Sequence, residues 1–101
     1  MKERIIYNAD NAAKVEIAEM LEGSENSLLY ADSMPELIDI MNKIDVSHIY
    51  MHVRNLSDIS LLHTIRSLNR NIQVSVIVQP KLYNIIQLLK DDSYDFIKEM
   101  V

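Results

Sequence analysis

Apolar and polar positions along this chain alternate between two periods. Four short runs rich in β-branched and aromatic residues predict strands at 4–7, 28–31, 48–53 and 73–78. Each run is followed by a segment of helical period, with apolar positions spread over 15–21, 37–44, 61–68 and 82–89. This alternation predicts right-handed crossovers onto a parallel sheet with helices on both faces, which is a doubly wound α/β fold.

Several residues mark where these helices begin and end. Ser33-Met-Pro-Glu36 is a capping box, and Pro80 is expected at a first helical position. Gly23 is the only glycine, and we expect it to end the first helix, because a positive φ costs glycine nothing. The remaining N-caps are expected at Asp10 or Asn11 and at Ser57 or Asp58.

Composition narrows the class of protein. A chain of 101 residues, 49% of them hydrophobic, predicts one domain (1–101) with one core. Cysteine is absent, which excludes disulfides and thiolate sites and is typical of a reducing compartment. The sequence has neither a signal-peptide pattern nor an apolar run of the ~20 residues that span a bilayer. We therefore expect a cytoplasmic protein that does not contact membranes.

Charge and histidine spacing argue against several kinds of ligand. The net charge is −5 and the ten Lys and Arg are scattered, so direct nucleic-acid binding is not expected. His48 and His52 stand about 13 Å apart along a strand, too far to share one metal ion, and His63 is most simply a helix surface residue. One glycine cannot form a phosphate-cradling loop. We expect no metal, no cofactor and no catalytic set. The acidic edge of the first helix, which we interpret as solvated, comprises Glu16, Glu19, Glu22 and Glu25.

Four stretches of the chain carry a resemblance to a known family. Residues 48–55, 61–69, 72–78 and 93–97 resemble the second half of a bacterial response-regulator receiver domain, from its third strand to the entry of its fifth. The resemblance implies a sheet of order 2-1-3-4 with Phe96-Ile97 as a short fifth strand at the edge. Residues 93–101 could equally form a short amphipathic helix.

The family's functional positions fall mostly on other residue types here. Its acidic pair after the first strand falls on Asn8 and Ala9, with Asp10 the nearest carboxylate, and its phosphate-accepting aspartate falls on His52. Its hydroxyl residue falls on Val78 or Gln79, and its lysine falls near Lys98 or Glu99.

These differences predict a loss of phosphorylation chemistry. Receiver phosphorylation needs Mg²⁺ held by oxygen ligands, chiefly carboxylates, and Asn8 and Ala9 cannot supply them. His52 offers nitrogen, which suits softer metals, and without the cation nothing offsets the charge of a transferring phosphoryl group. The resemblance thus implies a degenerate receiver, or pseudo-receiver, that is not an enzyme and regulates through protein–protein contact.

Two alternative functions remain open. Asn55-Leu-Ser-Asp-Ile-Ser60 also resembles the serine-bearing turn of a STAS domain, in which phosphorylation of Ser57 or Ser60 would switch partners. A STAS-like fold opens with directly joined strands, whereas a helix is predicted over 11–22, so an antiparallel opening hairpin would favour this alternative. A small α/β hydrolase or transferase ranks third, because no Ser-His-Asp grouping assembles at the predicted strand ends.

One face of the predicted sheet is expected to be less covered than the other. A receiver closes with a fifth helix beside the first, and this chain ends before such a helix. His48, Tyr50 and His52 share one face of the third strand, and Ser75 interrupts the fourth, whereas fully covered parallel strands read as continuous apolar runs. We therefore expect the face carrying Tyr50, His52 and Ile77 to be an interface, completed by a homodimer, another protein or a further segment.

Overall fold

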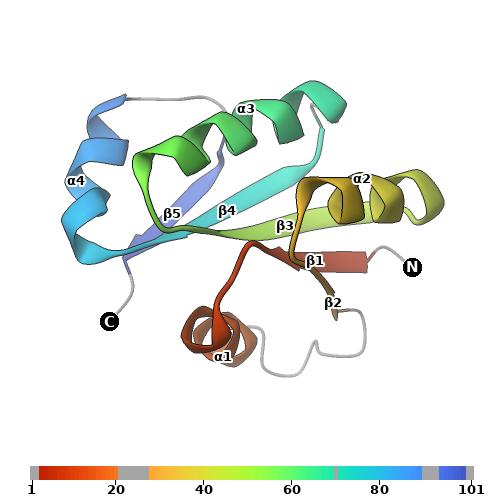
Figure 1. The fold of residues 1–101 in the computed structure, drawn as a ribbon, viewed down its shortest axis with the longest axis horizontal. Coiled ribbons are helices and arrows are strands. Elements are labelled where there is room, and N and C mark those ends of the chain that lie inside the picture. Colours follow the sequence, from red (N-terminus) through yellow and green to blue (C-terminus); the bar gives the residue numbers. More distant parts are fainter. Residues whose placement is uncertain (1–2, 21–27, 70, 90–93, 100–101) are drawn as a thin grey trace.

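The computed structural model describes residues 3–20, 28–69, 71–89 and 94–99. Its centre is a five-stranded, all-parallel sheet in the order β2-β1-β3-β4-β5 (Figure 1). The strands are β1 (Glu3–Tyr7), β2 (Leu28–Ala31), β3 (Val46–Val53), β4 (Gln73–Val78) and β5 (Phe96–Glu99). The predicted doubly wound fold and strand order are confirmed. Because β1 and β2 pair in parallel, the opening hairpin that would favour the STAS alternative is not what the chain forms.

Among the described residues, four α-helices connect and cover these strands. They are α1 (Asn11–Met20), α2 (Met34–Lys43), α3 (Ile59–Leu68) and α4 (Pro80–Leu89). Within the described ranges, no helix has the length and apolar character needed to cross a bilayer. The end of the chain forms β5 along the edge of the sheet, so the helical alternative for this segment is wrong over Phe96–Glu99.

The predicted helix starts are confirmed, although one of them lacks a side-chain cap. Ser33 Oγ accepts a hydrogen bond from the Glu36 amide, and α4 begins at Pro80. At α1 the cap is Asp10, whose Oδ1 accepts from the Ala13 amide at 2.8 Å. Helix α3 has Asp58 at its N-cap position, as predicted. A 3₁₀ turn over Leu56–Asp58 precedes it, and neither Ser57 nor Asp58 caps it with a side chain. Gly23 lies outside the described residues.

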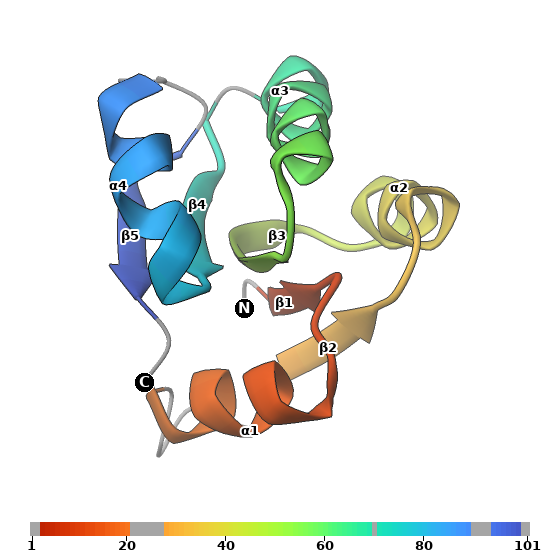
Figure 2. The ribbon, with the colours of Figure 1, turned by 60° about the vertical axis from the view of Figure 1, so that its left-hand side comes forward.

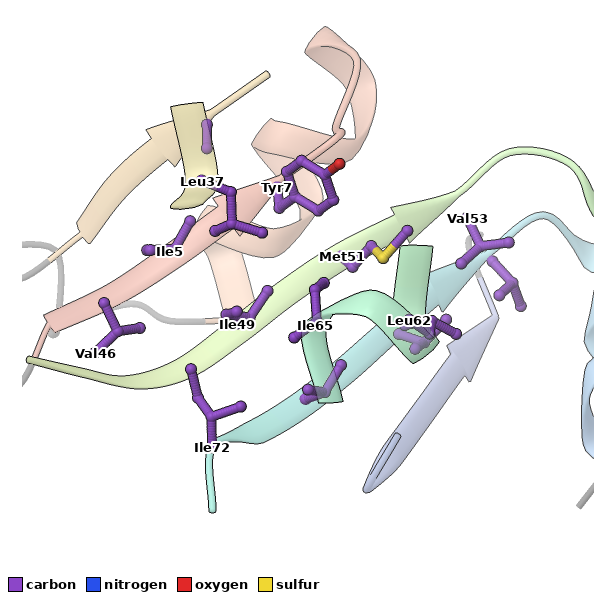
Figure 3. Packing of buried hydrophobic residues seen from close by; sticks show 14 of the residues in the cluster. Ile5, Tyr7, Leu37, Val46, Ile49, Met51, Val53, Leu62, Ile65 and Ile72 are labelled. Carbon is purple, nitrogen blue, oxygen red and sulfur yellow. The ribbon is translucent and has the colours of Figure 1, made fainter. Parts of the chain in front are cut away.

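The helices are distributed unequally over the two faces of the sheet. Figures 1 and 2 show α2, α3 and α4 on one side and α1 alone on the other. Because strand side chains alternate between faces, each face has its own apolar cluster. Residues of the three-helix cluster include Ile5, Tyr7, Ile49, Met51, Val53, Leu37, Leu62 and Ile65, all of them labelled in Figure 3. The α1 cluster is smaller and consists of Ile6, Ala9, Ala13, Ile17, Tyr50 and Ile77, with Leu28 packed against it.

The contact face of α1 differs from the one predicted. The predicted apolar stripe included Val15, Ile17 and Ala18, but Val15 is 60% exposed and Ala18 is exposed. Ala13 and Ile17, which are four residues apart and therefore on one side of the helix, are fully buried instead. A small residue at position 13 lets the helix backbone approach the sheet, and a short helix lying against one surface buries only a narrow stripe.

Candidate functional site

The positions that would carry receiver chemistry lie at the carboxyl ends of the strands. Asn8, Ala9 and Asp10 follow β1, and Gln79 follows β4. In the sheet register His52 pairs with Ile77, and Ile77 pairs with Lys98. The fold therefore brings the predicted pocket residues to one edge of the sheet, as the resemblance implied, although their contacts there are structural.

Asn8 joins the end of β1 to the end of β3. Its backbone is in the left-handed region with a φ of 60°, which asparagine tolerates better than most residues. Its Nδ2 donates to the His52 carbonyl at 3.0 Å. Arg54 donates to the Asn8 carbonyl from Nε and Nη2 at 3.1 and 2.7 Å. Where a receiver would hold a metal-binding acid, this chain has an amide and a guanidinium that connect two strand ends.

His52 is enclosed in the protein interior. Its side chain has no exposed surface, and neither ring nitrogen has a hydrogen-bond partner among the described residues. Burial lowers the pKa of His52, with the carboxylate of Asp10 opposing the shift and the Arg54 guanidinium adding to it. The imidazole is therefore neutral at pH 7 and out of reach of a phosphoryl donor.

The remaining pocket residues are engaged in other contacts. The bond from the Ala13 amide lowers the pKa of Asp10, so this carboxylate is ionised while it caps α1. Lys98 reaches across from β5 to α1, where its Nζ lies 3.8 Å from Glu16 Oε1. The Gln79 carbonyl accepts from the Leu82 amide in the first turn of α4. In the part of the chain that the structure describes, no group of three His, Cys, Asp or Glu residues could hold a metal ion.

A second site opens on the α1 side of the sheet, over β3, β4 and β5. It is a groove of about 210 Å³, and the residues that line it include His48, Tyr50, Ser75, Ile77, Phe96 and Lys98. The ring of His48 stacks on that of Tyr50 with centroids 4.1 Å apart, and Phe96 is 71% exposed at the outer wall. The groove is thus an aromatic surface beside α1, bounded on its outer side by the edge strand.

The groove contains a hydrogen-bonded serine and histidine that the sequence analysis did not predict. His48 Nε2 lies 2.7 Å from Ser75 Oγ. Burial lowers the pKa of His48, Arg4 lowers it further, and Asp95 opposes the shift. Such a pair is a nucleophile and base in hydrolases. Here Ser75 lies within β4, which is paired on both sides, with β3 and with β5, and the preceding Val74 amide donates to Asp95 Oδ2 at 2.8 Å. The pair instead satisfies two polar groups at the groove floor.

The predicted interface residues are distributed unevenly around this groove. Tyr50 lies at its floor and is largely buried, while His52 and Ile77 have no exposed surface. The least covered part of this face therefore lies not at His52 and Ile77, which we had expected to be open, but one or two strands outward at Phe96 and Lys98. The cause is α1, whose Ala13 and Ile17 belong to the same buried cluster as Ile77.

No family model matches the chain, and comparisons with curated proteins and with solved structures give no match either.

Proposed function

We propose that this domain is a cytoplasmic, non-enzymatic regulatory module, a pseudo-receiver that acts by contact with another protein chain. The observation that carries the proposal is the state of His52, which occupies the phosphoacceptor position of the resemblance. This side chain is fully buried and its backbone carbonyl is bonded to Asn8. A regulatory domain of this fold without an accessible acceptor must signal through its surface.

The surroundings of His52 support a loss of phosphoryl transfer. An aspartyl phosphate forms at an exposed carboxylate beside a cation that is itself held by carboxylates. Here Asn8 supplies an amide, Ala9 a methyl group, and the carboxylate of Asp10 is bonded to the first turn of α1. These residues stabilise the loop between β1 and α1, which is a structural role.

The uneven covering of the sheet supports action by contact. Parallel sheets are normally covered by helices on both faces, and among the described elements three helices pack on one face and one on the other. An exposed aromatic residue beside an apolar groove is typical of an interaction surface, because aromatic anchors dominate the energetics of protein interfaces. Phe96 and the groove floor at Tyr50 provide this combination.

Intact-mass spectrometry after incubation with a small-molecule phosphoryl donor and Mg²⁺ tests the proposal. The expected mass is that of the unmodified chain. A stoichiometric, acid-labile adduct that is lost in the His52→Gln variant would contradict the proposal, because it would place a working acceptor at this position. A conventional receiver domain treated in parallel provides the positive control.

A further inference from the structure

Two large apolar side chains stand out by their exposure among the described residues. Leu88 on α4 is 78% exposed and Phe96 on β5 is 71% exposed. Leu88 belongs to a helix that covers the three-helix face and does not line the groove. Phe96 lies on the opposite face, directly beside the groove, where it pairs in register with Ser75 and Ser75 with Tyr50. The projecting aromatic ring and the hollow that could receive such a ring are thus neighbours on one patch.

This arrangement has the property that a two-fold interface requires. In a two-fold dimer the same patch faces itself, so it must contain both a projecting group and the hollow that receives it. We propose that a second copy of this chain covers the groove, with Phe96 of each copy packed into the groove of the other over Tyr50 and Ser75. The inference rests on the proposed function, because it names the partner of that contact surface.

The groove edge also carries side chains of both charges, as an interface between two identical copies requires. The chain carries a net charge of −5, yet the groove edge has a cation, Lys98, and an anion, Glu16, already 3.8 Å apart. In the proposed dimer the Lys98 of one copy lies near the Glu16 of the other, so the ion pairs can be exchanged or shared between copies. Arg4, whose charge acts on both His48 and Tyr50, adds a second cation near the groove. The groove edge is therefore less acidic than the chain as a whole, which lowers the repulsion between two copies that each carry a net charge of −5.

Light scattering and sedimentation equilibrium over a concentration series on the full chain test the proposal. We expect a reversible dimer with a dissociation constant in the micromolar range, because two aromatic anchors in small grooves make a small interface. The Phe96→Ser variant should raise that constant about a hundredfold, since each dimer loses two buried rings. The matched control is Leu88→Ser, which removes an equally exposed apolar side chain elsewhere and should leave the constant unchanged.

A charge-reversal experiment tests the ion-pair exchange without relying on Phe96. Lys98→Glu makes the groove edge acidic, and Glu16→Lys makes it basic, so each variant alone should dimerise less than the unchanged chain. An equimolar mixture of the two should form a heterodimer, because the opposite charges then meet across the interface. Circular dichroism on each variant checks that the fold is retained.

Three results would overturn the proposal. They are a wild-type chain that stays monomeric up to millimolar concentration, equal effects of Phe96→Ser and Leu88→Ser, and a charge-reversed mixture that associates no better than its components. A monomer that also takes up no phosphate would leave the proposed function standing with a different protein as partner. A dimer that takes up phosphate would support the proposed dimer interface and contradict the proposed function.

Discussion

The two faces of the sheet differ in what covers them and in what they bury. The face beneath α2, α3 and α4 buries aliphatic side chains and a few larger ones such as Tyr7 and Met51. The α1 face contains both polar side chains that the described residues bury, His52 and Ser75, together with the groove. One face therefore supplies most of the hydrophobic stabilisation, and the other combines a smaller cluster with a surface that can bind.

The largest effect is expected on the three-helix face. Ile49 is fully buried at the centre of the sheet, and Ile49→Ala should lower the free energy of unfolding by about 3–4 kcal/mol, from lost transfer energy and the cavity left behind. Urea unfolding followed by circular dichroism measures the change. A loss below about 1 kcal/mol would mean that this face is not the main core.

A smaller and more local effect is expected on the α1 face. Ile17 is one of two fully buried side chains among the described side chains of α1, and Ile17→Ala should lower the free energy of unfolding by about 2–3 kcal/mol. Because α1 covers its face alone, its amides should exchange hydrogen faster while those of α3 stay protected. Hydrogen exchange with mass spectrometry compares the two helices. Equal acceleration in both helices would show that the faces do not open separately.

The hydrogen bond from Asn8, after β1, to the carbonyl of His52 on β3 should contribute less to the free energy of unfolding. Asn8→Ala removes the bond to the His52 carbonyl and places alanine at a φ of 60°, so it should cost about 1–2 kcal/mol. Asn8→Gly also loses the bond but accepts the backbone angle, so it should cost less. Thermal unfolding of both variants separates the backbone contribution from the hydrogen bond, and a glycine variant less stable than the alanine variant would contradict this account.

The smallest change at neutral pH is expected from His52→Leu, which replaces a buried ring lacking hydrogen bonds by an apolar side chain and should alter stability by less than about 1 kcal/mol. The effect of this substitution on stability should appear at acidic pH. The pKa of His52 is lower in the folded state than its ordinary 6.5, so the unfolded chain binds more protons. The stability contribution linked to His52 is fully present above pH 6.5, and it is lost as the pH drops toward the lowered pKa.

Unfolding measured from pH 8 to pH 4 should therefore show a shallower acid decline in His52→Leu than in the unchanged chain. Leu88→Ser, which alters no titratable group, serves as the control. The half-buried His48 also has a lowered pKa, so part of the decline should persist in the His52→Leu variant through His48. Identical acid limbs in the two proteins would show that His52 does not set this dependence.

Local sequence signals predicted the elements better than the contacts between them. The strand over Gln73–Val78 and the start of α4 at Pro80 follow from β-branched runs and from proline geometry, which act over a few residues. At α3, Asp58 Oδ2 accepts from the Arg54 amide at 2.9 Å, and this bond takes the side chain away from the cap. That competition is not visible in a capping pattern.

The candidate sites depend on contacts between distant residues. His48 and Ser75 are 27 positions apart, and their hydrogen bond exists only because β3 and β4 pair in one particular register. The polar Ser75 within an apolar strand was the one signal of it in the sequence. Similarly, Ala13 of α1 belongs to the same buried cluster as Tyr50 and Ile77 of the sheet, and its small size gave no sign of such a contact.

The strand order also bears on how the chain can assemble during synthesis. β1 lies between β2 and β3, and its neighbour on one side is the eight-residue strand that ends at Val53. Until that strand has left the ribosome, β1 has an unpaired edge. Pairings this far apart in sequence form slowly, because a long loop must close before any contact stabilises it. β1 therefore cannot be paired on both sides until the chain has been translated through β3.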